Sequence, residues 1–508
     1  MAYSSILSLL LLLPLLPLSL YLLLNRNKKK KPDLPPGPTN LPIVGSLHRL
    51  GLLPHHSLFA LSRKHGPLMH LKLGNVPVVV ASSADTARAF LKTHDLDCCS
   101  RPPLTSLDRL SYGFNDIAFS PYGGQWRELR KVCIIELFSS KKVLSFRPIR
   151  QEEVDRMVGS IASQTDAVDL SEELMSLANH ITCRQGKQSN LHTYVTYMTA
   201  VGKRYYAPGE GSRLKRILAE TEALFMGFFF EDYFPLLGWL DRLTGMRARL
   251  ERNFSELDGL YQEVIDEHKD PAWRREEDRE EDAIDALLSI ERSGANLTDE
   301  HIKGVLMNIF VAGSDTSSAS VEWTMAELMR HPSVMKKAQE EVRSIVGKKG
   351  KVEESDLDRL YYLKCVLKEG FRVHPIVPLL VQRETIQHCR VNGYDIPAKT
   401  RLLVNMVAIG RDASVWERPE EFDPERFVGS AIDIRGHDFE LIPFGAGRRI
   451  CPGMGVGILV VELALANLLY SFDWELPEGT TKEDIDMSEA PGITVHRKSH
   501  LRLVAKRV

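Results

Sequence analysis

A glycine-rich loop that presents one cysteine at the start of an apolar helix constrains this chain most. The loop covers residues 444–453 (FGAGRRICPG), and the sequence predicts a helix over 456–472. Glycines allow the backbone to approach a large, flat group, and a helix N-terminus favours the thiolate of Cys451. A lone cysteine is more often a buried structural thiol. Here the apolar helix, which we expect to be buried, and the nearby cation of Arg449 favour a ligating sulfur.

The N-terminal segment predicts a membrane anchor. Residues 6–24 form an apolar run of 19 residues that contains Pro14 and Pro17, and the lysine-rich residues 25–31 follow it. This length spans a bilayer core of roughly 30 Å, and the basic flank is expected to stay in the cytoplasm. A cleaved signal peptide is the alternative, but the run lacks a basic flank before it and a small-residue cleavage site. We therefore expect residues 1–31 to be an uncleaved anchor.

The rest of the chain predicts one large domain behind a short hinge. Residues 32–45 are rich in proline, which favours a stiff spacer over a flexible linker. We expect residues 46–508 to be a single catalytic domain, because no second linker interrupts them. The 44% of apolar residues excludes wholesale disorder, and 65 basic against 67 acidic residues give no field that attracts nucleic acid. Seven cysteines suit a reducing compartment rather than a disulfide scaffold.

Periodicity predicts a mainly helical domain with a small sheet. Residues 67–83 alternate around Gly74-Asn75, which predicts a β-hairpin. Most of 100–370 is expected to be helical. Long helices are expected over three ranges, bounded by proline and glycine: 299–330, 332–346 and 354–373. Short strands are expected at 391–396 and 401–407.

The cysteine loop resembles that of the cytochrome P450 family, in its plant microsomal form. Phe444, Gly447, Arg449, Cys451 and Gly453 match the family spacing F-x-x-G-x-R-x-C-x-G. The resemblance covers residues 32–508 and implies the cytochrome P450 fold, which is mainly α with a small β portion (α+β). It also implies that haem b is the cofactor and that Cys451 is the axial thiolate of its iron. Arg449 would pair with a haem propionate, and Phe444 and Gly453 would lie against the cofactor.

A second motif lies in the predicted helix over 354–373. Glu369 and Arg372 stand three residues apart, and Arg426 lies further along the chain. On their own, Glu369 and Arg372 predict an exposed ion pair of little energetic weight. The resemblance implies instead that all three form a buried structural triad near the cysteine loop.

A third motif, residues 312–316, lies inside the helix predicted over 299–330. Glycine is a poor residue for a helix interior, and hydroxyl side chains can bond back to helix carbonyls. An incidental polar stripe is the simpler interpretation. The resemblance implies that Thr316 holds a water near bound O₂, that Asp315 helps to deliver protons, and that Ala312 and Gly313 leave room over the haem.

Further cofactor and substrate contacts follow from the resemblance. Trp126, Arg130 and, less directly, Arg383 resemble propionate partners, with an indole N–H and two guanidinium groups as donors. Each alone would be interpreted as a surface side chain with an apolar stem. Apolar residues are expected to form the substrate pocket: Phe310, Val311, Val377, Leu379 and Ile493.

The implied activity is that of a haem-thiolate monooxygenase acting on a small hydrophobic plant metabolite. One oxygen atom of O₂ enters the substrate, with electrons from NADPH supplied by a separate flavin-containing reductase and a possible contribution from cytochrome b5. The cation-bearing side chains Arg127, Lys131 and Arg448 are candidates for docking the reductase. The expected location is the endoplasmic reticulum membrane, with a single span and the domain facing the cytosol. The alternatives are a haem-thiolate enzyme that rearranges or dehydrates its substrate without O₂, and a non-catalytic haem-binding membrane protein.

One segment departs from the family pattern. Gln185 to Met198 are about 14 extra, mostly polar residues. They predict either a surface loop or an error in the gene sequence as assembled.

Overall fold

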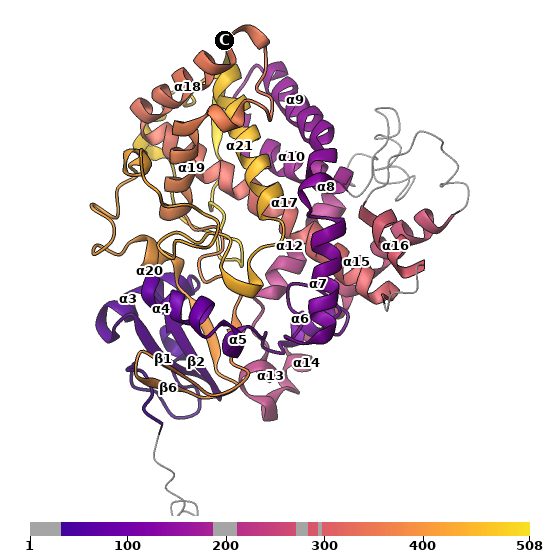
Figure 1. Cartoon of the computed structure of the whole chain (residues 1–508), viewed down its shortest axis with the longest axis vertical. Coiled ribbons are helices and arrows are strands. Elements are labelled where there is room, and N and C mark those ends of the chain that lie inside the picture. The colour runs from indigo at the N-terminus through magenta and orange to yellow at the C-terminus, as the bar shows by residue number, and fades with distance from the viewer. Residues whose placement is uncertain (1–31, 186–210, 271–282, 293–296) are drawn as a thin grey trace, which may run out of the picture.

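The computed structural model describes residues 32–185, 211–270, 283–292 and 297–508, which form a helical body with a smaller β-rich end (Figure 1). The predicted anchor and nearly all of the segment from Gln185 to Met198 lie outside these residues. The longer helices are α3 (Pro54–His65), α7 (Gly124–Glu136), α9 (Arg147–Ser163), α10 (Leu170–Gln185), α12 (Gly211–Phe225), α15 (Met246–Lys269), α16 (Ala283–Arg292), α17 (Asp299–Arg330), α18 (Pro332–Val346), α19 (Tyr361–Val373) and α21 (Met454–Ser471). The shorter helices are α4 (Ala84–Arg88), α5 (Asp95–Cys98), α6 (Thr105–Leu110), α8 (Ser140–Ser145), α13 (Phe230–Tyr233), α14 (Leu240–Leu243) and α20 (Met406–Gly410).

Three small sheets complete the fold. The strands are β1 (Leu68–Leu73), β2 (Val76–Ala81), β3 (Val168–Asp169), β4 (Arg383–Glu384), β5 (Cys389–Val391), β6 (Tyr394–Ile396), β7 (Arg401–Val404), β8 (Phe472–Glu475) and β9 (Arg502–Arg507). The largest sheet has the order β1-β2-β7-β4, with β1 and β2 antiparallel and β2 and β7 parallel. The hairpin predicted around Gly74 is confirmed, because Leu73 pairs with Val76.

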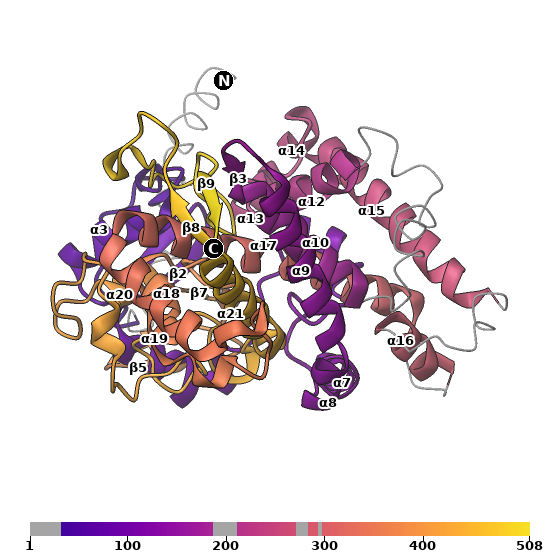
Figure 2. The ribbon, with the colours of Figure 1, turned by 90° about the horizontal axis from the view of Figure 1, so that it is seen from above.

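Helix α17 is the central element, and local signals set both of its ends. Thr298 accepts a hydrogen bond from the His301 N–H before the first turn, which satisfies a free backbone donor. The helix ends at Arg330 because His331 precedes a proline. Helix α10 packs along α17, and α21 and α19 pack on it as well. Seen from above, α9, α10 and α12 gather on one side and α18 to α20 on the other (Figure 2).

Helix α21 lies in the core, as its apolar sequence predicted. Every residue from Val460 to Leu469 is buried. Among the described residues, α21 is the one helix that is long and apolar enough to cross a membrane. Its burial against α17 and α18 explains that composition, so it gives no sign of a membrane span.

Three predicted elements were wrong in their bounds. The helix expected from 354 begins at Tyr361, because Glu354 is held by Arg150 of α9 at 2.6 Å and Asp356 accepts the Glu353 N–H, which turns the chain. The single strand expected over 391–396 is two strands, β5 and β6, joined by a turn. Asn392 and Gly393 both have positive φ in that turn, as a two-residue hairpin requires.

The strand expected over 401–407 is also shorter than predicted. Strand β7 ends at Val404 because the Asn405 side chain accepts the backbone N–H groups of Val407 and Ala408 and so begins α20. The helices over 299–330 and 332–346 have the predicted bounds.

Candidate functional site

The cysteine loop is held in shape by its own backbone. The Cys451 N–H donates to the Phe444 carbonyl at 3.0 Å, and a short helical turn over Gly447–Arg449 precedes the cysteine. Gly447 has a φ of 68°, and a Cβ there would lie 2.2 Å from the Leu91 carbonyl oxygen. No other residue fits this position, so the glycine is required for the loop to pack against the segment before α5.

Cys451 lies just before the first turn of α21. Burial raises the pKa of its thiol, while the N–H groups of Gly453 and Met454 and the charge of Arg130 act in the opposite direction. These donors would stabilise a thiolate. Cys451 nevertheless keeps accessible surface. The residue is therefore only partly covered by the described residues, whereas its thiol group lies deep in the molecule.

Helix α17 is uncovered at Ala312 and Gly313, the first two residues of the predicted 312–316 segment, whereas Ser314 and Asp315 are buried. Nearly all other residues of the helix are buried, but Ala312 and Gly313 are exposed and Thr316 is half-buried. Side chains this small in the middle of a buried helix keep their exposure only where neighbouring side chains leave them uncovered. The Thr316 hydroxyl donates to the Ala312 carbonyl at 2.9 Å, and its oxygen can still accept a further hydrogen bond.

Four buried or half-buried arginines gather around the cysteine loop. Arg449 Nε donates to the Cys99 carbonyl at 2.8 Å, and Arg383 bridges Asp95 and the Ala446 carbonyl. Arg130 Nη2 donates to the Ile450 carbonyl at 2.5 Å. Arg101, which the sequence did not point to, donates to the Val381 and Gln382 carbonyls. Arg449 Nη1 is buried and has no partner among the described residues.

Positive charge is in excess in this cluster. Burial and the neighbouring Arg383 and Arg130 lower the pKa of Arg449 to about 9, and similar effects lower that of Arg101. A buried cation with an unpaired N–H is costly unless an anion joins it. A buried guanidinium with one unpaired nitrogen, a sulfur with backbone N–H donors and the exposed Ala312 and Gly313 of α17 fit a flat, anionic, thiolate-ligated group such as haem.

Trp126 differs from its predicted role. Its indole N–H donates to the Ile117 carbonyl at 3.0 Å, so it is not a free donor for a propionate. The ring instead supports the arginines, because the Arg449 guanidinium lies 3.9 Å from the ring centre and that of Arg130 lies 5.5 Å from it. Arg383 is likewise satisfied by protein groups. The sequence identified Trp126 and Arg383 as hydrogen-bond donors but did not show that protein groups would accept their hydrogen bonds.

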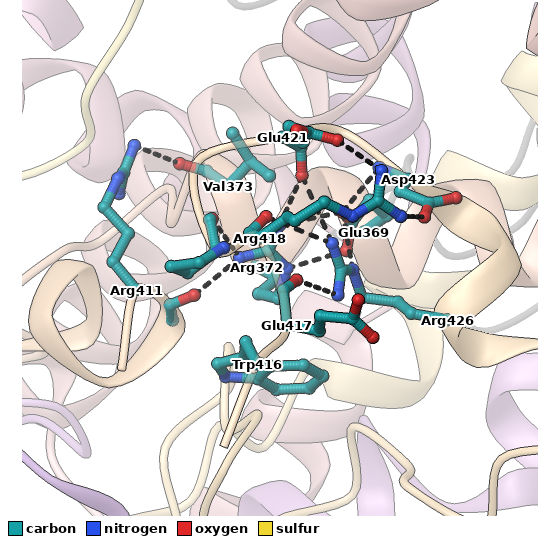
Figure 3. Close-up of polar contacts among 12 residues, drawn as sticks. Glu369, Arg372, Val373, Arg411, Trp416, Glu417, Arg418, Glu421, Asp423 and Arg426 are labelled. Atoms are coloured by element: carbon teal, nitrogen blue, oxygen red, sulfur yellow. Dashed lines mark hydrogen bonds and ion pairs between the residues drawn. The ribbon is translucent and has the colours of Figure 1, made fainter. Parts of the chain in front are cut away.

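The structure brings the expected triad together (Figure 3). Arg372 makes two hydrogen bonds to Glu369, at 2.7 and 2.8 Å, and Arg426 reaches the same carboxylate at 3.0 Å. The side chains of Glu369 and Arg372 are fully buried. Arg372 also donates to the carbonyls of Gly410 and Pro419, so the triad ties α19 to the segment before the cysteine loop.

Asp315 lies beside two residues that the sequence did not identify. His496 Nε2 is 2.6 Å from Asp315 Oδ1, and the Glu222 carboxyl group of α12 lies next to them. The Asp315–His496 contact joins positions 181 residues apart. No local pattern encodes such a contact, which is why the sequence alone did not reveal it.

The predicted pocket residues divide between three apolar clusters. Phe310 and Val311 are buried in one cluster, and Ile493 packs against it. Val377 packs with Trp323 in a second cluster, whereas Leu379 packs with the β1–β2 hairpin in a third. The first three residues are thus brought together, and the last two are not grouped with them.

Comparison with known proteins places these features in a family. The sequence pattern of the family described as Cytochrome P450 matches residues 35–503. The chain is 49% identical to strychnine-11-hydroxylase of Strychnos nux-vomica, over 96% of this chain and 94% of that protein. It is also 49% identical to cytochrome P450 71A9 of Glycine max, over 94% of each chain. A solved zebra fish cytochrome P450 with progesterone superposes with a TM-score of 0.74 at 26% identity, over 90% of this chain and all of that one.

These matches confirm the expected fold, mainly α with a small β part, and the resemblance read from the cysteine loop. They span almost the whole chain and include a plant hydroxylase and a further plant cytochrome P450, each 49% identical to this chain. The chain therefore belongs to the cytochrome P450 family and is an oxidoreductase of the haem-dependent monooxygenase type.

Proposed function

We propose that this cytochrome P450 oxidises a small hydrophobic plant metabolite with electrons that a separate NADPH-dependent reductase supplies. The observation that carries the proposal is the set of groups around Cys451. The sulfur has backbone N–H donors, the buried Arg449 guanidinium has one nitrogen without a partner among the described residues, and α17 carries the exposed Ala312 and Gly313. Bound haem supplies the activation of O₂ and the transfer of one oxygen atom.

The residues around the loop would hold the cofactor. Cys451 would be the iron ligand, with Phe444 and Gly453 at the sulfur side. Arg449 and Arg130 would pair with the propionates, since Arg449 has a free N–H. Arg383 and Trp126 would act through their neighbours: one anchors Asp95 and the loop, and the other supports the two guanidinium groups. The Glu369–Arg372–Arg426 triad would fix the position of the cysteine loop relative to α19.

Residues of α17 would manage water and protons. The Thr316 oxygen can accept a hydrogen bond from a water in the space beside Ala312 and Gly313. Asp315 would pass protons to that water. It would receive them from His496, which is hydrogen-bonded to its carboxylate and is partly exposed to solvent. The two side chains leave the helix in different directions, so water must connect them.

The substrate would contact the apolar wall made by Phe310, Val311 and Ile493, with Val377 and Leu379 further out. The strychnine hydroxylase among the relatives is in keeping with a plant metabolite as substrate. The reductase would dock where Arg127 and Lys131 are exposed on α7, near Arg448. Arg448 already pairs with Asp95 at 2.8 Å, so it would contribute less than the other two. Cytochrome b5 could use the same face, and we place the protein on the endoplasmic reticulum membrane.

Replacement of the cysteine tests the proposal. We expect Cys451→Ser to lose the absorption spectrum of thiolate-ligated, CO-bound reduced haem, because a hydroxyl is a far weaker ligand. Cys365→Ser on α19, another buried cysteine, is the matched control and should keep the spectrum. A wild-type spectrum in Cys451→Ser would contradict the proposal.

The alternative of a rearrangement or dehydration without O₂ has its own test. Products are measured with the wild-type enzyme, reductase and NADPH in the presence and absence of O₂. The monooxygenase requires O₂ and NADPH, whereas a rearrangement enzyme makes product without them. A non-catalytic haem protein makes none under either condition.

A further inference from the structure

Two carboxyl groups and an imidazole from three separate segments meet beside the proposed oxidation site. The ligand atoms of Glu222, Asp315 and His496 all lie within 4.8 Å of one another. Asp315 is buried, Glu222 is half-buried, and a quarter of the His496 side chain is exposed. We call these three residues the acid cluster.

Hydrogen bonding within the acid cluster is incomplete. His496 satisfies Asp315 Oδ1, and the buried Asp315 Oδ2 has no well-aligned partner in the described part of the chain. The Thr494 hydroxyl and a protonated Glu222 are the two side chains near enough to donate to this carboxylate. Burial and the adjacent Asp315 raise the pKa of Glu222 to about 10, so it holds that proton at neutral pH. Burial alone would raise the pKa of Asp315, but the hydrogen bond and charge of His496 lower it.

The charges of the acid cluster do not balance without this proton. Burial lowers the pKa of His496, but the hydrogen bond and charge of Asp315 outweigh it and raise the pKa overall. One imidazolium therefore faces two acids. No lysine or arginine is among the described groups that shift the pKa of Glu222 or Asp315. The other charged groups near His496 are Glu322 and, beyond it, Arg497.

The surroundings of the acid cluster indicate what kind of cation would fit. Asp315 directly precedes Thr316 and follows the exposed Ala312 and Gly313 by less than one turn. The neighbouring wall of Phe310 and Val311 is apolar, and Ile493 lies three residues before His496 in the chain. A cation that approaches Glu222 along this apolar wall would be part of a molecule whose remaining surface is apolar. A hydrated metal ion does not have such a surface.

We propose that Glu222 and Asp315 bind the protonated amine of a substrate whose remaining surface is apolar. This rests on the proposed function and narrows its substrate class to amines. The ammonium N–H replaces the Glu222 proton as the donor to the two carboxylates, and that proton passes to water. Binding of the cation is thus linked to the release of one proton.

The test uses the full-length holoenzyme and two probes of the same shape. N,N-dimethyl-2-phenylethylamine is cationic at neutral pH, and isopentylbenzene is its uncharged carbon counterpart. Calorimetry in buffers of different ionisation enthalpy measures affinity and proton release. We expect Glu222→Gln to weaken amine binding by about tenfold or more and to leave isopentylbenzene unchanged. Glu220→Gln is the matched control, because Glu220 lies on the same helix as Glu222 but pairs with Arg249 of α15. It should change the affinity for neither probe.

The pH dependence gives a second measurement that needs no loss of binding. In the wild type, amine affinity should rise by up to about tenfold per pH unit from about pH 6.5 to 8.5, because a proton must leave Glu222. This slope should vanish in Glu222→Gln.

Several outcomes would overturn the proposal. These are equal affinity for the two probes, equal weakening of both by Glu222→Gln, and a pH slope that persists in Glu222→Gln and so belongs to His496. Binding of Zn²⁺ that depends on Glu222, without preference for the amine, would make the acid cluster a metal site instead. If the wild type binds the amine but not isopentylbenzene, the result would count against the apolar pocket of the proposed function. The pH dependence of amine affinity would still decide the role of Glu222.

Discussion

At the scale of single residues, the unsatisfied polar atoms mark where ligands are expected. Buried donors and acceptors in proteins are almost always paired. In the cysteine loop, Arg449 Nη1 is buried without a partner in the described ranges. On α17, Asp315 Oδ2 is buried, and only Thr494 and a protonated Glu222 are near enough to donate to it. These two atoms lie on residues that the family resemblance singled out independently. Other buried polar atoms without a partner lie elsewhere in the described residues, so incomplete hydrogen bonding supports the site only where it coincides with a sequence motif.

The hydroxyl of Thr316 supports the first prediction. Thr316→Ala removes the acceptor for a water beside Ala312, so proton delivery should fail while substrate contacts remain. We expect product formed per NADPH to fall by about tenfold or more, with reduced oxygen leaving as hydrogen peroxide and substrate affinity nearly unchanged. NADPH, product and peroxide are measured together with the reductase.

Ser320→Ala is the control for Thr316. Its hydroxyl also donates to the carbonyl four residues back, at 2.7 Å, but it is buried. It should keep wild-type coupling. Wild-type coupling in Thr316→Ala as well would mean that the substrate itself organises the water or that oxygen insertion is not the reaction.

At the scale of elements, buried ion pairs join the helices that carry the site. Glu327 near the end of α17 binds His374 Nε2 at 2.7 Å and His331 Nδ1 at 3.3 Å, which links α17 to α18 and α19. The Glu369–Arg372–Arg426 triad ties α19 to the segment that leads into the cysteine loop. The loop is thus fixed to α17 through charged contacts as well as through apolar packing.

Glu327 predicts how stability depends on pH. Burial would raise the pKa of Glu327, but its hydrogen bonds with His331 and His374 lower it to about 2. Because the folded-state pKa is depressed, the stabilisation is present above the ordinary pKa near 4.5 and is lost as pH falls towards 2. Glu327→Gln should lower the free energy of unfolding at pH 7 by on the order of 3 kcal/mol. Denaturant unfolding at several pH values checks this, and a gap that stays constant down to pH 3 would contradict it.

Two ion pairs with the same spacing separate burial from charge. Arg372–Glu369 and Arg418–Glu421 both join residues three apart, but the first pair is fully buried and the second is exposed. Arg372→Lys cannot keep the hydrogen bonds to Glu369, Gly410 and Pro419, so we expect a loss of about 3 kcal/mol or more and weaker haem retention. Arg418→Lys should cost less than about 1 kcal/mol. Equal losses of stability for the two variants in thermal unfolding would show that burial does not determine how much each ion pair contributes.

Local signals set both ends of α17, the turn between β5 and β6 and the end of β7, whereas a distant partner sets the start of α19. Thr298 and His331-Pro332 are neighbours of the helix they bound, so α17 was predicted correctly. The start of α19 depends on Arg150, more than 200 residues from Glu354. The Asn392-Gly393 turn carried a local hairpin signal, which the single strand expected over 391–396 overlooked. For the site, motifs identified Cys451 and Thr316, but Glu222 and His496 have no motif and are recognised only in space.

At the scale of the whole molecule, exposed apolar side chains gather where the described chain begins. Leu236, Trp239 and Leu243 lie in the segment around α14 and are 90%, 57% and 74% exposed. Tyr233 of the same segment accepts the Asn75 N–H at the β1–β2 turn. Ile43 is 77% exposed in the loop that pairs with β1. Figure 1 shows α13 and α14 at the same end as β1 and β2. A chain anchored by residues 1–31 would turn this end towards the membrane.

Removal of residues 1–31 tests how the domain meets the membrane. The described domain holds every group proposed to bind haem, so the truncated protein should keep the haem spectrum in detergent-free buffer.

The truncated protein should also stay partly bound to lipid vesicles, because each leucine that enters the lipid contributes about 2 kcal/mol. Adding Leu236→Glu and Leu243→Glu should lower vesicle binding by about tenfold or more, since both side chains would leave the lipid. Leu144→Glu, which alters another exposed leucine, on α8 (60% exposed), should have no such effect. Vesicle flotation measures all three proteins. Failure of the truncated protein to bind haem would show that residues 1–31 are part of the fold, and equal release by Leu144→Glu would show that net charge, rather than this surface, controls binding.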